Sequence, residues 1–120
     1  MTHAFDHLHE LAQLDDAALR QRFGPRAIGV LVVCSRLLRT QPIAGEALTP
    51  ESFTAEVKRH YAEYVTGSRA LGEAMGQAAD AAKRSDLAAA RSVLHDFLAS
   101  CNAPFYREIA TARLESLGSK

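Results

Sequence analysis

The sequence predicts an all-α protein, and three observations support this fold class. Apolar residues recur at intervals of three and four along most of the chain, which is the period of an amphipathic helix. Helix-start signals, such as Thr49 followed by Pro50 and Glu51, precede several of these stretches. The one segment that suits a buried strand, residues 30–33, has no second strand candidate to pair with. We expect a compact bundle of five to seven helices, with a central apolar helix and a C-terminal helical hairpin.

Length and composition indicate one globular domain, residues 1–120, with no charge-driven partner. Lys and Arg total 14, as do Asp and Glu, so a general attraction to nucleic acid or an anionic membrane is not expected. The first residues lack the pattern of a signal peptide. The apolar stretch 27–38 is shorter than the about 20 residues that span a bilayer. We therefore expect a cytoplasmic protein, and the Ala- and Arg-rich composition suggests a bacterial source.

The first third of the chain predicts two short helices before the apolar one. Thr2 is a suitable cap for a helix to Gln13, and either Asp15 or Asp16 is suitable to start the second. Gly24 suits the left-handed backbone that ends many helices. Pro25 suits the first turn of the helix that follows.

The segment from Pro25 to about Thr40 holds the densest run of large aliphatic side chains. Its length favours a helix over a strand, and Arg36 and Arg39 fall where they can reach solvent. We expect this helix to be buried on most sides, which makes Cys34 a packing residue. If the other helices do not surround it, the helix is itself the surface that binds a partner.

The second half predicts long helices joined by short turns. One helix begins at Thr49–Pro50 and runs to Lys83–Arg84, bent or broken near Gly67, because glycine costs about 1 kcal/mol relative to alanine inside a helix. Ser85–Asp86 caps the next helix, whose expected buried stripe starts at Leu87. The last helix starts at residues 102–104.

Motifs in the C-terminal half carry a family resemblance. They are Asp-Leu-x-x-Ala-Arg at 86–91, an acidic residue with Phe-Leu at 96–98, and Pro-x-Tyr-Arg-Glu at 104–108. Over about residues 71–117 the chain resembles the DUSAM family, a small domain of unknown function described mainly from myxobacteria. The resemblance implies an all-helical accessory or regulatory protein and names no catalytic residue.

Side chains that bind metals or catalyse reactions do not form a convincing set. His3 and His7 are four residues apart, with Glu10 near them, so one helical face offers three weak metal ligands. Cys101 lies on an apolar stripe, away from His95. The chain has no Glu-x-x-His repeat of the kind that binds two metal ions in a helical bundle. We expect no enzymatic activity and no cofactor.

Two groups of side chains are candidates for contact with another protein, because Arg and Tyr are favoured in such interfaces. Arginines flank the apolar helix, and tyrosines occur in the helices that follow. The candidates are Arg22, Arg26, Arg36, Arg39, Tyr61, Tyr64 and Tyr106.

The leading hypothesis for function is a non-enzymatic protein-interaction module. It would act as an adaptor, as a regulator or as an immunity protein that sequesters a toxin, and a second copy of the chain is one candidate partner. One alternative is a helical sensor that binds a metal or small ligand through the His cluster or a pocket against the apolar helix. The other is a regulator that binds nucleic acid, although the zero net charge argues against it.

Overall fold

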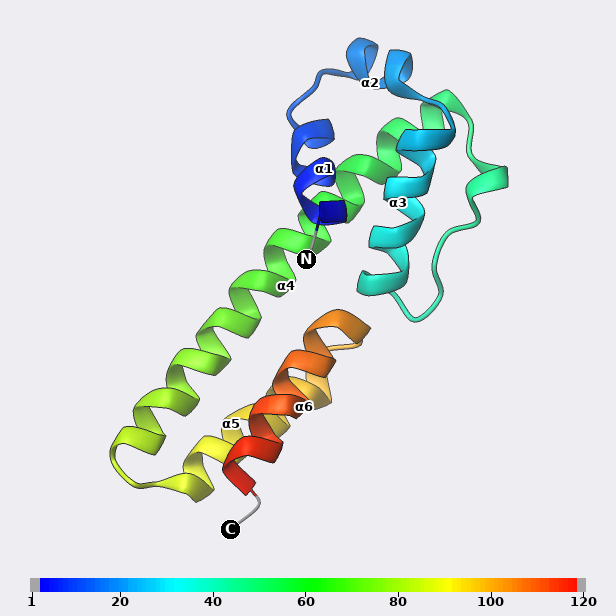
Figure 1. Ribbon diagram of the computed structural model, residues 1–120. Helices are drawn as coiled ribbons and strands as arrows, with labels where there is room; N and C mark the ends of the chain where they lie inside the picture. The colour runs from blue at the N-terminus through cyan, green and yellow to red at the C-terminus, as the bar shows by residue number, and fades with distance from the viewer. Residues whose placement is uncertain (1–2, 119–120) are drawn as a thin grey trace. The chain divides into compact units, whose positions relative to one another are not determined.

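A computed structural model describes residues 3–118, and within that range every regular element is helical (Figure 1). The all-α prediction is therefore confirmed. The elements are α1 (His3–Ala12), α2 (Asp16–Arg22), α3 (Pro25–Leu38), the 3₁₀ turn η1 (Gly45–Ala47), α4 (Pro50–Lys83), α5 (Leu87–Ser100) and α6 (Pro104–Gly118). No helix in this part of the chain is long and apolar enough to cross a membrane.

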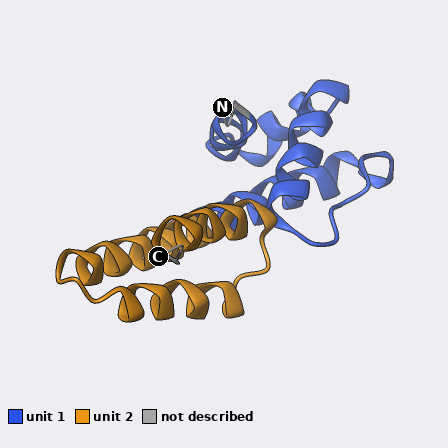
Figure 2. Cartoon of the chain, turned by 60° about the horizontal axis from the view of Figure 1, so that its bottom comes forward, with its two compact units in different colours: residues 1–65 blue, residues 66–120 orange. Residues whose placement is uncertain are grey.

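The chain divides into two compact units, residues 1–65 and residues 66–120 (Figure 2). The boundary falls inside α4, so the first part of this helix belongs to unit 1 and the rest to unit 2. The expectation of a single domain over all 120 residues stays a prediction.

Side-chain caps begin three of the helices where the sequence indicated. Asp15 accepts a hydrogen bond from the backbone N–H of Ala18 at 2.8 Å, and Asp86 accepts one from Ala89 at 3.1 Å. At the start of α4, the Thr49 hydroxyl accepts a hydrogen bond from the N–H of Ser52 at 3.1 Å. These bonds satisfy N–H groups that have no partner inside the helix. The proposed cap at Thr2 lies outside the described residues.

The left-handed residue lies at a different turn from the one predicted. Gly24 is extended, with φ 171° and ψ 176°, and precedes α3 without a side-chain cap. The positive φ belongs to Ser85, at 63°. Its N–H donates to the carbonyl of Ala82, and the next N–H, of Asp86, donates to Ala81, both at 2.9 Å. This pair of bonds is the Schellman pattern, which ends α4 and starts the hairpin to α5.

Helix α4 runs without a break through Gly67. The glycine is needed for packing, because a Cβ atom there would lie 2.3 Å from Cε2 of Tyr106. Tyr106, on α6, is 2 % exposed, and its hydroxyl lies 2.9 Å from the Ser68 hydroxyl. The prediction of one long helix is confirmed, and the alternative of two separate helices is wrong.

The two units have cores of different composition. The largest buried side chains of unit 1 come from α1, α2, α3 and the first turns of α4, namely Phe5, Leu8, Leu19, Leu31, Phe53 and Val57. The buried set of unit 2 contains five alanines beside three large residues, namely Ala74, Ala78, Ala81, Ala90, Ala110, Leu94, Phe97 and Tyr106. Leu87, the first residue of α5, was expected in this core, but it is 38 % exposed.

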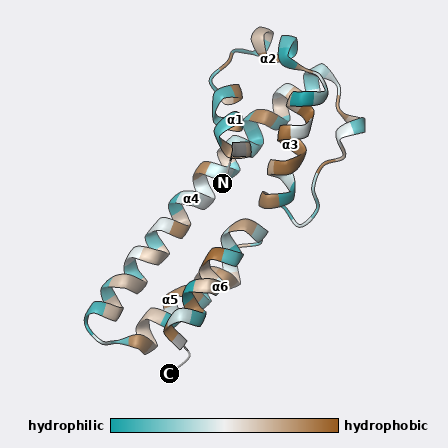
Figure 3. Ribbon diagram, viewed as in Figure 1, coloured by the Kyte–Doolittle hydropathy of each residue, from teal (hydrophilic) through white to brown (hydrophobic). Residues whose placement is uncertain are grey.

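Helix α3 is the most apolar element of unit 1 (Figure 3), yet only one of its faces is buried. That face consists of Leu31, Cys34, Ser35 and Leu38. The Cys34 thiol contacts the backbone carbonyl of Ala4 in α1 at 3.4 Å, and η1 approaches Ile28 from another side. The prediction of a helix is confirmed. The prediction that it is buried on most sides is confirmed in part, because one stripe with Arg26, Gly29, Val33 and Arg36 is exposed.

Candidate functional site

The exposed side of α3 forms an apolar stripe with charged residues at its ends. We call it the α3 outer face, and it consists of Arg26, Gly29, Val30, Val33, Arg36 and Leu37. These residues recur at intervals of three and four, so they share one side of the helix. Val33 is 43 % exposed, which is more than any other large hydrophobic residue in the described part of the chain. Val30 and Leu37 beside it are half-buried.

The arginines around this face differ in whether they are paired. Arg22, Arg26 and Arg36 are exposed. Within the described part of the chain, their side chains form no hydrogen bond or ion pair. All three guanidinium groups are therefore available to a ligand or a partner. The sequence identified these three residues correctly as surface arginines.

Arg39 has a structural role, in contrast to the other candidate arginines. Its Nε and Nη2 atoms donate to Glu63 Oε1 at 3.0 Å and Oε2 at 2.6 Å, and Nη2 also lies 3.5 Å from Glu56 Oε1. This forked pair holds the pKa of Glu63 below its usual value and raises that of Arg39. Arg39 thus joins the end of α3 to α4, and this pairing contradicts its proposed place as a free partner-binding residue.

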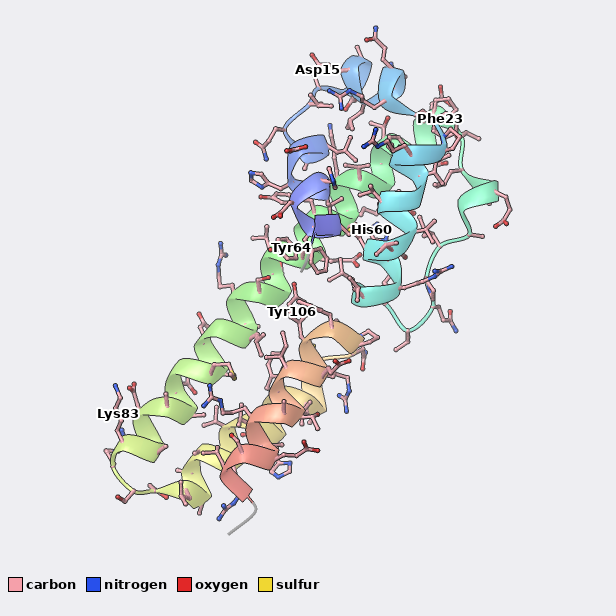
Figure 4. All side chains as sticks on the ribbon, in the orientation of Figure 1. Asp15, Phe23, His60, Tyr64, Lys83 and Tyr106 are labelled. Carbon is pink, nitrogen blue, oxygen red and sulfur yellow. The ribbon has the colours of Figure 1, made fainter. Side chains whose placement is uncertain are left out.

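A buried histidine, labelled in Figure 4, lies 3.4 Å from Glu56 Oε1 through its Nδ1 atom. His60 is fully buried, and its Nδ1 lies 2.7 Å from the Glu56 carbonyl. A carbonyl oxygen only accepts, so Nδ1 carries the proton. His60 Nε2 and Glu56 Oε1 are buried and have no hydrogen-bond partner among the described atoms. Desolvation lowers the pKa of His60, and the charge of Arg39 adds to this effect.

The candidate tyrosines are largely engaged inside their own units. Tyr61 has its hydroxyl 2.7 Å from His9 Nδ1, and the Tyr64 ring stacks on Phe5 with 4.4 Å between centroids. Both tyrosines are half-buried. Tyr106 is buried in unit 2, which contradicts its proposed place on a partner-binding surface. Helical spacing alone could not separate this core tyrosine from a surface one.

The proposed metal ligands are only partly described. His7 Nδ1 lies 3.7 Å from Glu10 Oε1, and the side chain of His3 falls outside the described residues. Among the described side chains, no group of three or more His, Cys, Asp and Glu residues could hold a metal ion.

The cysteines do not form a nucleophilic site. Burial raises the pKa of the Cys34 thiol to about 12, which suits the packing role predicted for it. Cys101 is half-buried just after α5, whereas His95 is exposed. Neither thiol has an activating base among its described hydrogen-bond partners.

Unit 1 contains a cleft at one end of the α3 outer face. Its volume is about 320 Å³. It is lined by His7, Glu10 and Leu11 of α1, Arg22 of α2, and Arg26, Ala27 and Val30 of α3. We call it the α1–α3 cleft. The sequence suggested a pocket against this helix, but it could not show that the His7 and Arg22 groups would line the same cleft.

A second cleft of about 270 Å³ lies within unit 2. Its walls are residues of α4 and α5, most of them small or apolar, together with Gln77 and the acidic Glu73 and Asp96. The two clefts therefore carry opposite charges. No observation in unit 2 indicates what would fill the second one.

The motifs that carried the family resemblance have structural roles. Asp86 caps α5, Tyr106 packs against Gly67, and Arg107 donates a hydrogen bond to the carbonyl of Cys101 at 2.8 Å. These roles explain why the motifs indicated a fold and no chemistry.

Comparison with known proteins identifies a family without a described activity. No curated protein and no solved structure matches the chain. A family model does match, over residues 6–117, and so it covers both units rather than the C-terminal half alone. The model does not carry the DUSAM name, so that resemblance stays a prediction. The chain belongs to the family described as "Protein of unknown function (DUF2379)".

Proposed function

We propose that this chain is a non-enzymatic protein-interaction module that binds its partner through the α3 outer face. The observation that carries the proposal is the exposure of Val33, at 43 %, in the middle of an apolar stripe that ends in unpaired arginines. Such an arrangement is typical of a binding surface, where a desolvated apolar centre is surrounded by polar groups.

Covering this stripe would contribute part of the free energy of binding. Full burial of a Val or Leu side chain contributes about 1.5–3 kcal/mol. Val33 is 43 % exposed, and Val30 and Leu37 are half-buried, so a partner would remove part of each from water. The unpaired Arg26 and Arg36 would add charge-assisted hydrogen bonds at the two ends.

Charge complementarity defines the partner as a segment of another protein with apolar residues between acidic ones. Arg26 and Arg36 are ten positions apart in a helix that rises about 1.5 Å per residue, so acidic groups about 15 Å apart fit them. A symmetric pairing of two copies through this face would bring arginines of equal charge together. We therefore favour a different protein over a second copy.

The test compares two exposed apolar residues that differ in location. Val33→Asp places a charge in the α3 outer face, and Leu87→Asp places one on an equally exposed site in unit 2. Each variant is used as bait in cells of the native organism, and the proteins that copurify are quantified. We expect one protein to be retained by the wild type and by Leu87→Asp but lost from Val33→Asp. A partner retained equally by both variants would contradict the proposal.

The setting of this interaction is also part of the proposal. The composition and the resemblance to the DUSAM family support a cytoplasmic regulator, an adaptor or an immunity-type protein in a bacterium. If the partner is a toxin, its activity in cells falls when the wild type is expressed, and Val33→Asp does not protect.

A further inference from the structure

We propose a second binding function, in which the α1–α3 cleft takes a small organic anion: a single carboxylate or phosphate group on a short apolar body. The α1–α3 cleft and the α3 outer face share Arg26 and Val30. They differ in the ligand proposed for each, a small anion for the cleft and a protein segment for the outer face. The inference goes beyond the proposed docking function and does not rest on it.

The size and walls of the cleft define the body of the ligand. A volume of about 320 Å³ is at the lower end of the range for small-molecule pockets, about 300–1,000 Å³. Leu11, Ala27 and Val30 form the apolar wall of the cleft, and most of the Leu11 side chain is buried. A ring or a short carbon chain therefore fits this wall better than a fully polar ligand does.

The charges in the cleft define the head group. Arg22 and Arg26 both line it, and neither is neutralised by an ion pair within the described part of the chain. Among the described residues of the lining, Glu10 is the only acidic one, against two arginines. The net charge of the cleft is therefore positive, and a guanidinium group donates two parallel hydrogen bonds to carboxylate or phosphate.

The N-terminal end of α3 also favours a negatively charged ligand. Arg26 and Ala27 lie in its first turn, whose N–H groups have no intrahelical acceptor. Gly24 provides no side-chain cap, and the first turn contains no acidic residue. The helix dipole adds a partial positive charge at this end, so the backbone and the two arginines favour an anion together.

The experiment is a titration of the ¹⁵N-labelled full chain at low salt, followed by NMR. The probes are benzoate and phenyl phosphate, which share a ring and differ in their anionic group. Benzyl alcohol tests the ring without charge, and inorganic phosphate tests charge without a ring. We expect saturable shifts at the amides of Arg26, Ala27 and Val30 with at least one of the two organic anions. That anion should bind at least about tenfold more tightly than either control probe.

Three variants test the assignment of the charges. Arg26→Gln should weaken binding about tenfold, the size expected for the loss of one charge-assisted hydrogen bond. Arg20→Gln is the matched control, because Arg20 is also exposed and lies outside the cleft lining, and it should leave the affinity unchanged. Glu10→Gln should tighten binding several-fold, since it removes the negative charge from the cleft.

Several results would overturn the inference. They are an absence of saturable shifts with both organic anions, equal binding of benzyl alcohol, equal binding of inorganic phosphate, or equal weakening by Arg26→Gln and Arg20→Gln. Val33 lies outside the cleft lining, so Val33→Asp should bind the anion like the wild type. The docking proposal and this one can therefore fail separately.

Discussion

The core of unit 2 contains a larger share of alanines than the core of unit 1 does, although Phe97 and Tyr106 are also buried there. In unit 1 the buried set includes Phe5 and Phe53, and a polar cluster at Arg39, His60 and Glu63 lies beside it. The buried residues of α4 in unit 2 are all alanines. The stability of unit 1 should therefore fall when a large buried side chain is shortened or when the pH is lowered. The stability of unit 2 should fall when atoms are added to its core.

The largest effect is expected from loss of an aromatic ring in unit 1. Phe53 is fully buried, and its ring meets that of Phe23 edge to face with 5.6 Å between centroids. Phe53→Ala should lower the free energy of unfolding by about 3–5 kcal/mol, measured by urea denaturation. A loss below about 1 kcal/mol would show that unit 1 is not held by its large side chains.

The next effect tests close packing in unit 2. Gly67→Ala would place a Cβ 2.3 Å from the Tyr106 ring, so we expect a loss of about 1–3 kcal/mol despite the better helix propensity of alanine. Gly72→Ala is the matched control in the same helix, because no other group lies within 4 Å of its Cβ position.

Gly72→Ala should stabilise the protein by up to about 1 kcal/mol. Thermal unfolding followed by circular dichroism measures both variants. Equal stabilisation by the two substitutions would contradict the packing of Gly67 against α6.

The polar cluster predicts that the stability of unit 1 depends on pH. The folded-state pKa of His60 is lowered from 6.5, so its contribution to stability is present above pH 6.5. It is lost as the pH falls from 6.5 towards the folded-state value, because the unfolded chain takes up the proton first.

Glu63 adds a second loss at lower pH. Its folded-state pKa is held below 4.5, so its contribution is lost only as the pH falls below 4.5. His60→Phe should remove the first loss and keep the second, as measured by urea denaturation from pH 7 to well below pH 4.5. A wild-type stability that stays constant from pH 7 to pH 5 would be inconsistent with a buried neutral histidine.

The smallest effect concerns the turn that begins the hairpin. Ser85 has φ 63°, which costs a residue with a side chain about 1 kcal/mol relative to glycine. Ser85→Gly should therefore raise the melting temperature by a few degrees. Gly24→Ala should change it little, because Gly24 is extended and only the Arg22 carbonyl lies near its Cβ position, at 3.9 Å. A larger rise in melting temperature for Gly24→Ala than for Ser85→Gly would contradict the left-handed backbone at Ser85 and the extended backbone at Gly24.

Local signals predicted the helices well, since caps and periodicity depend on neighbouring residues. Asp15, Thr49 and Asp86 begin their helices as expected. Burial was predicted less well, because it depends on contacts between distant segments. The spacing of residues in α3 did not reveal which side α1 would cover, so the exposure of Val33 was not predicted.

The candidate site was predicted in part for the same reason. Arg22, Arg26 and Arg36 were recognised as surface charges, but Arg39 looked equivalent to them in the sequence. Its pairing with Glu63 brings together residues 24 positions apart. His60 could have been recognised as a core residue, because it continues the buried stripe of Phe53 and Val57 at helical spacing.

The most direct test of the α3 outer face is site-specific photo-crosslinking in the native organism. A photoreactive amino acid replaces Val33 in one strain and Leu87 in another, since both positions are exposed in the folded chain. We predict that position 33 crosslinks to one protein, within a segment that has apolar residues between acidic ones, and that position 87 does not. Crosslinks to that protein from position 87 but not from position 33 would show that the partner binds elsewhere.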